Sequence, residues 1–165
     1  MDETPNAQAA LMADDFEEAN DEVIDFAGRC RDAQWSAVVS GEGWPVGVVL
    51  HHIATGHALM IEWLERARRG REITKTAEEI DADNVAHARD FAGVTRAETV
   101  EELRRQGAAL ALVIRSLEAD ELATSVPFGP AGSVPVTTEA LAAVSARHPR
   151  THLTAARGAV EPATG

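Results

Sequence analysis

Histidine is the residue type in this chain whose placement most strongly indicates chemistry. The sequence holds six histidines, and five of them lie in two apolar stretches: His51, His52 and His57 in one, His148 and His152 in the other. On an ideal helix, His52 falls within the apolar stripe, whereas His51 falls on the opposite side and His57 at the edge of the stripe. His148 and His152 are four residues apart, so their rings project from neighbouring turns of one face.

This spacing allows two imidazoles of one helix to reach a single metal ion. His52 on a facing helix would supply a third ligand and leave positions for water and substrate. The alternative is that each histidine is an ordinary core residue held by hydrogen bonds. Three imidazoles buried without partners would each cost about 1–3 kcal/mol, and a shared metal removes that cost. Spacing alone leaves both interpretations open.

The elements that would position these residues are helices. Apolar residues recur at spacings of three and four over about 10–38, and a second helix is expected from Pro45 to about Arg69, where Gly70 ends it. A shorter helix is expected over 76–92. A further helix is expected after it, and either Thr95 with Glu98 or Thr99 with Glu102 could form its capping box.

The remaining sequence completes the expected fold. Residues 118–136 are rich in Pro and Gly, which indicates a long ordered loop or a short hairpin, and a last helix follows with Thr137 or Thr138 as its cap. The pattern predicts an all-α fold: a four-helix bundle with a short extra helix and a long loop before the last helix. One domain over 1–165 is expected, with an ordered core over about 10–157.

Charge and composition exclude several functions. The net charge of −12 argues against general nucleic-acid binding and against docking on anionic membranes. The start "MDETPNAQ" lacks the pattern of a secretory signal, and the longest apolar run, 108–114, is too short to span a membrane. The single cysteine, Cys30, excludes an internal disulfide and fits a reducing cytosol, so a cytoplasmic location is expected.

Three further residues bear on the site. Asn84 and His87 share a face of the 76–92 helix and could supply a second-shell contact or a substrate hydrogen bond, although ordinary helix packing is the simpler interpretation. Cys30 lies on the core stripe of the first helix, where a small buried hydrophobe is the commoner role. Pro149 separates the two histidines of the last helix, where a proline either kinks the helix near Ser145 or starts a new segment.

Four segments, in order, resemble the DinB/YfiT-like superfamily of metalloenzymes: "GWPVGVVLHHIA", "IDADNVAHA", "TVEELRRQGAALALVIRSLEADEL" and "HPRTHL". The most specific parts are a Trp and a His eight residues apart (44 and 52) and the His-x-x-x-His at 148–152. The resemblance covers about residues 10–157, and the nearest branch includes the N-terminal domains of mycothiol-dependent maleylpyruvate isomerases and related thiol transferases. It implies a four-helix bundle, often dimeric, whose metal is held by three histidines, here His52, His148 and His152.

The resemblance also implies a function. It predicts a divalent metal, Zn²⁺ or Ni²⁺, and the transfer of a small-molecule thiol such as mycothiol or bacillithiol to an electrophilic substrate. A hydrolase that activates water is the enzymatic variant. The competing hypothesis is a non-catalytic dimeric metal- or ligand-binding bundle with structural histidines. The sequence contains no segment that resembles the C-terminal domain of the full-length isomerases, so isomerase activity itself is not expected.

Overall fold

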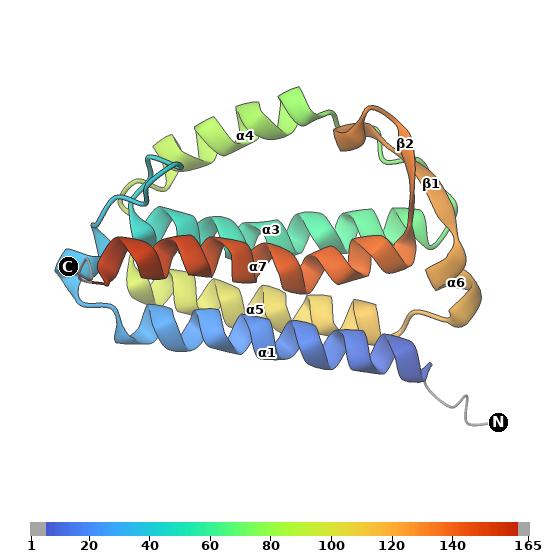
Figure 1. Cartoon of the computed structure of the whole chain (residues 1–165), viewed down its shortest axis with the longest axis horizontal. Helices are drawn as coiled ribbons and strands as arrows, with labels where there is room; N and C mark the ends of the chain where they lie inside the picture. Colours follow the sequence, from blue (N-terminus) through green and yellow to red (C-terminus); the bar gives the residue numbers. More distant parts are fainter. Residues whose placement is uncertain (1–5, 162–165) are drawn as a thin grey trace.

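The computed structural model describes residues 6–161 and places four long helices in a bundle (Figure 1). These are α1 (Ala7–Arg29), α3 (Val46–Ala67), α5 (Arg96–Arg115) and α7 (Thr138–Val160). α5 and α7 each lie beside both α1 and α3, so α1 and α3 occupy opposite corners. The two long helices that come first in the sequence are therefore diagonal neighbours, and α3 and α7 lie side by side. The predicted all-α four-helix bundle is confirmed.

The core follows the apolar stripes. In α1 the predicted stripe is buried, with Phe16, Ala19, Val23 and Ala27 fully inaccessible to solvent. The first helix nevertheless ends at Arg29 and does not continue to residue 38, because Cys30 adopts an extended conformation. The side chain of Gln34 then accepts a hydrogen bond from the Arg31 backbone N–H and starts the short helix α2 (Asp32–Trp35).

The extra helix is α4 (Ala77–Asp90), which crosses above α3 at one side of the bundle (Figure 1). It begins with a capping box between Thr76 and Glu79, and none of its residues is buried. α5 begins with the capping box of Thr95 and Glu98, the first of the two expected pairs. α4 is thus a surface helix laid over the bundle.

Of the two alternatives for the segment before the last helix, a long loop or a short hairpin, the structure shows the hairpin. The segment forms α6 (Ala119–Ala123) and an antiparallel hairpin of β1 (Ser125–Phe128) and β2 (Val134–Thr137), joined by the 3₁₀ turn η1 (Gly129–Ala131). Thr137 caps α7, as expected. The expectation that Pro149 starts a new segment is wrong, because α7 continues through this buried proline to Val160.

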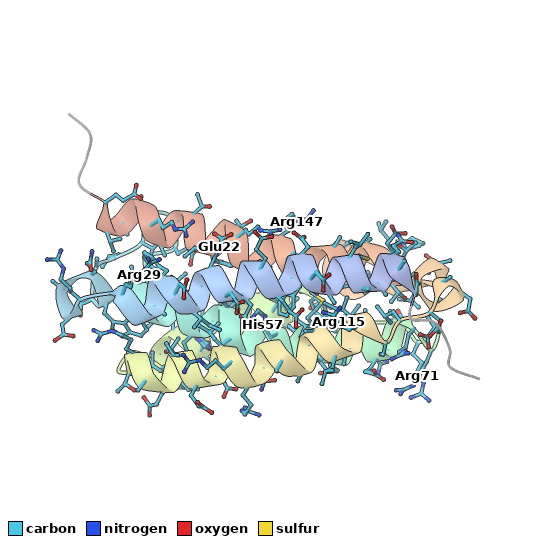
Figure 2. The ribbon with its side chains drawn as sticks, turned by 90° about the horizontal axis from the view of Figure 1, so that it is seen from below. Glu22, Arg29, His57, Arg71, Arg115 and Arg147 are labelled. Atoms are coloured by element: carbon cyan, nitrogen blue, oxygen red, sulfur yellow. The ribbon has the colours of Figure 1, made fainter. Side chains whose placement is uncertain are left out.

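Polar side chains lie both inside the bundle and on its surface. Figure 2 shows His57 within the bundle, whereas Arg71 and Arg147 extend toward its outside. Among the helices of residues 6–161, none is long and apolar enough to cross a membrane.

Candidate metal centre

Three histidines converge between α3 and α7. His52 comes from α3, and His148 and His152 come from successive turns of α7. One nitrogen from each ring can be chosen so that all three lie within 4.8 Å of one another. The ring centroid of His52 lies 5.3 Å from that of His148 and 5.0 Å from that of His152. The three residues that spacing selected are therefore neighbours in space.

Burial keeps two of these imidazoles neutral. Desolvation, together with the proximity of the other rings, lowers the pKa of His52 to about 3. The same causes lower the pKa of His148 to about 3. A neutral imidazole has one nitrogen with a free lone pair, which is the form that binds a metal ion. At neutral pH both rings are therefore available as ligands.

A carboxylate orients the third imidazole. Oε1 of Glu42 lies 2.7 Å from Nδ1 of His152, so the Nδ1–H donates to the carboxylate, and in the neutral form of the ring the lone pair is on Nε2. Metal-binding histidines usually donate their other N–H in this way, which fixes the tautomer and the direction of the ring. The second oxygen of Glu42 is buried and has no hydrogen-bond partner. The carboxylate that orients His152 thus keeps an uncompensated acceptor, which favours a cation nearby.

The position of Glu42 depends on two glycines that flank it. Gly41 and Gly43 have φ values of +89° and +74°, which residues with a Cβ rarely adopt. Beyond them the chain folds back, since the Val39 N–H donates to the Trp44 carbonyl over 2.8 Å. The loop between α2 and α3 is thereby closed tightly enough to direct Glu42 toward α7.

Gly56 makes room for His148. A Cβ at position 56 would lie only 3.0 Å from Cε1 of His148. The space beside this glycine is thus occupied by an imidazole from the facing helix. Close approach of α3 and α7 at this level is what allows the rings to meet.

A cavity of about 450 Å³ opens directly onto the three histidines. Much of its wall is apolar, and the apolar residues come from the Glu42 loop, α3, α4 and α7: Trp44, Leu59, Met60, Trp63, Ile80 and Val144. Trp44 also contacts His52 edge-on, with ring centroids 5.7 Å apart. Asn84 of α4 also lines the cavity. The histidine cluster therefore has an organic-sized, largely apolar chamber beside it.

The two residues predicted to contact a metal ligand or the substrate, Asn84 and His87, lie in different surroundings in the structure. Asn84 lines the cavity, whereas His87 is not part of its wall. Nε2 of His87 lies 3.4 Å from Nδ1 of His51, and the two rings stack. His87 meets His52 only edge-on, at a centroid distance of 5.7 Å. His51 is buried outside the cluster, in agreement with its helical phase.

His57 also stays out of the cluster. Its Nε2 lies 2.8 Å from Oδ1 of Asn20, and the Asn20 side-chain amide donates to the Leu103 carbonyl over 3.1 Å. Desolvation lowers the pKa of His57 to about 4. This histidine is a neutral core residue that links α1, α3 and α5.

The donor set fits a divalent cation. Three imidazole nitrogens are the ligands that Zn²⁺ and similar ions take in open catalytic sites. Here two of the rings are neutral by burial and the third is oriented by a carboxylate. The residue that sequence reasoning missed is Glu42. Its only signal is an acidic residue between two glycines, at the end of a predicted helix.

Comparisons with known proteins agree with the fold. The chain resembles the solved structure of YfiT from Bacillus subtilis, described as a probable metal-dependent hydrolase with an unusual four-helix bundle topology. The TM-score is 0.71 at 16% sequence identity, over 96% of this chain and 90% of that one. At this identity the likeness concerns the fold. No curated protein sequence matches the chain significantly. The model of the DinB superfamily matches residues 15–156, and the chain belongs to that superfamily.

Proposed function

We propose that His52, His148 and His152 hold a divalent cation, Zn²⁺ or Ni²⁺, and that the protein is a metal-dependent enzyme. The observation that carries this proposal is the convergence of three ring nitrogens within 4.8 Å, at the wall of an apolar cavity. When bound, such a cation supplies a positive charge that lowers the pKa of a thiol or water beside it and so yields a nucleophile near neutral pH.

The chain's own residues position and protect this chemistry. Glu42 accepts the hydrogen bond from Nδ1 of His152, so that Nε2 is the nitrogen left to bind the cation. Trp44, in edge-on contact with His52, covers one side of the cluster. The apolar wall of the cavity excludes water from the reacting groups, which strengthens electrostatic interactions there.

The nucleophile comes from solution. Cys30, the one cysteine of the chain, is buried in the core, and desolvation raises the pKa of its thiol. A buried protonated thiol is a poor nucleophile. It also does not line the cavity. A small-molecule substrate must therefore bring the attacking sulfur or oxygen into the cavity.

We infer that the substrates are a low-molecular-weight thiol, such as mycothiol or bacillithiol, and an organic electrophile. The resemblance of the sequence to the thiol transferase branch supports this reaction. The thiol would lose its proton to solvent, its sulfur would bond to the electrophilic carbon, and the leaving group would depart. Hydrolysis is the second candidate, and the fold shared with YfiT, a probable metal-dependent hydrolase, favours it.

Metal content tests the first step. The full chain, expressed without a metal-affinity tag, is expected to carry about one equivalent of Zn or Ni by elemental analysis. His52→Ala should abolish this, and His51→Ala, which removes the neighbouring imidazole outside the cluster, should not. A chain that neither carries nor takes up metal would refute the metal centre and leave a non-catalytic bundle.

Activity then separates the two reactions. The metal-loaded chain is assayed with 1-chloro-2,4-dinitrobenzene and mycothiol or bacillithiol for transfer, and with p-nitrophenyl acetate without thiol for hydrolysis. Transfer that depends on both thiol and His52 would support the transferase. Ester hydrolysis without thiol, also lost in His52→Ala, would favour the hydrolase.

A further inference from the structure

The side chains that line the cavity indicate which kind of ligand it binds, a question that the three histidines alone leave open. Apart from the three histidines, its polar side chains are Glu42 and Asn84, and Trp44 and Trp63 each carry an indole N–H. Within the part of the chain that the structure describes, no lysine or arginine lines the cavity. Sites that bind carboxylates or phosphates usually provide such cations, most often arginine. This wall offers a carboxylate instead.

Two basic residues that precede or belong to helices of the cavity wall form ion pairs with residues outside that wall. Lys75, the only lysine in the sequence, pairs with Asp83 beside the start of α4. Arg150, on the helix that carries two of the histidines, pairs with Asp15 of α1 over 2.7 Å. The chain as a whole has a net charge of −12. An anionic molecule would therefore meet a negative protein and find no lysine or arginine in the cavity wall to compensate its charge.

The size and shape of the wall suit an uncharged ring system. An apolar cavity of about 150 Å³ holds one benzene molecule, so about 450 Å³ admits a fused or substituted aromatic group and a reacting end. Trp44 and Trp63 provide aromatic surfaces, and Ile80 provides an aliphatic one. Asn84 offers an amide that can donate or accept one hydrogen bond.

We propose that the organic substrate of this site is uncharged and largely apolar over the part that occupies the cavity, with one hydrogen-bonding group at Asn84. The wall discriminates against molecules that place a carboxylate or phosphate there. One part of this proposal rests on the proposed function, namely that the reacting end of the substrate lies beside the three histidines. The preference for a neutral ligand does not depend on that function, because it follows from the side chains of the wall alone.

The test compares two ligands of nearly equal shape, 2-naphthylacetamide and 2-naphthylacetate. Each is titrated into the full-length chain by calorimetry at pH 7.5, after dialysis against a chelator, so that a carboxylate cannot bind through a metal ion. The neutral amide is expected to bind at least tenfold more tightly than the carboxylate. Equal or tighter binding of the carboxylate, or no binding of the amide at millimolar concentration, would overturn the proposal.

Two variants of α4 locate the effect in the cavity. Ile80→Lys places a cation in the wall and should raise affinity for the carboxylate at least tenfold. Val85→Lys adds the same charge on the same helix, at a side chain that is 69% exposed, and should change the affinity little. Asn84→Lys serves the same purpose if Ile80→Lys does not fold by circular dichroism. Equal effects at positions 80 and 85, or no effect at either cavity position, would contradict the assignment.

The outcome is independent of the metal proposal. Zinc and nickel content is measured on the same preparation before dialysis. Bound metal without ligand discrimination would overturn this inference and leave the metal centre intact. Discrimination in a chain that never takes up metal would support the substrate class and refute the metal-dependent function.

Discussion

The hydrogen bond between Asn20 and His57 predicts that Gly107→Ala lowers the free energy of unfolding, although helix propensity alone would predict an increase. Gly107 lies inside α5, where alanine would normally stabilise a helix by about 0.5–1 kcal/mol. A Cβ at this position would lie 2.2 Å from Nδ2 of Asn20, well inside any real contact. Asn20 is buried and bonds both to the Leu103 carbonyl and to His57, so Gly107→Ala must displace it and break these bonds.

The magnitude follows from the groups left without partners. Each buried polar group that loses its hydrogen bond costs about 1–3 kcal/mol, and two bonds are at risk. After the gain in helix propensity is subtracted, Gly107→Ala should lower the free energy of unfolding by about 3 kcal/mol. For a chain of this size that corresponds to a decrease in Tm of about 6–12 °C.

Urea denaturation of the metal-free chain measures this change, and Gly158→Ala is the matched control. Gly158 is also helical, but a Cβ there would meet nothing within 4 Å. The control should be unchanged or up to about 1 kcal/mol more stable. If Gly107→Ala is as stable as its control, the buried contacts of Asn20 do not hold α1, α3 and α5 together as argued.

Three further predictions concern the site and its surroundings. Gly56→Ala should weaken zinc binding about tenfold, because the added Cβ crowds His148. The free energy of unfolding of the metal-free chain should not fall. Unchanged zinc affinity in a competition assay with a chelating dye would contradict this prediction. Glu42→Ala should weaken zinc binding about 10–100-fold in the same assay. Glu42→Gln should weaken it less, because glutamine keeps an oxygen acceptor for His152. Equal losses of zinc affinity in the two variants would argue against an orienting role of Glu42. The pKa of His57 falls from 6.5 in the unfolded chain to about 4 in the folded one, so the unfolded chain binds the proton more tightly and stability is lost as pH falls from about 6.5 to 4. That group contributes up to about 3 kcal/mol, and unfolding curves of His57→Gln should show a shallower dependence over this range; an unchanged slope would refute the assignment.

Much of the metal centre could be predicted because it depends on helical phase. His52, His148 and His152 each lie where a repeat of 3.6 residues places the apolar stripe, and the bundle brings those stripes together. The predicted capping box of Thr95 and Glu98 is local as well, since its two residues are three positions apart.

Other features depend on long-range geometry and could not be predicted in this way. Glu42 reaches His152 across 110 residues of sequence, through a loop whose path is set by two positive φ values. Asn84 and His87 share a helix face, yet α4 crosses the bundle so that one lines the cavity and the other contacts His51. The end of the first helix at Arg29 was missed, although Gly28 directly precedes it, because the apolar pattern continues beyond this point.

The absence of buried residues in α4, within the described chain, bears on how a ligand enters the cavity. A 14-residue helix is only marginally stable in isolation, and α4 has little packing to add to its own hydrogen bonds. Its amide protons should therefore exchange through local opening, at a lower free energy than those of α1, α3, α5 and α7. Since Ile80 and Asn84 belong to the cavity wall, each such opening also uncovers the chamber. Slowed amide exchange in α4 is then a direct measure of ligand occupancy.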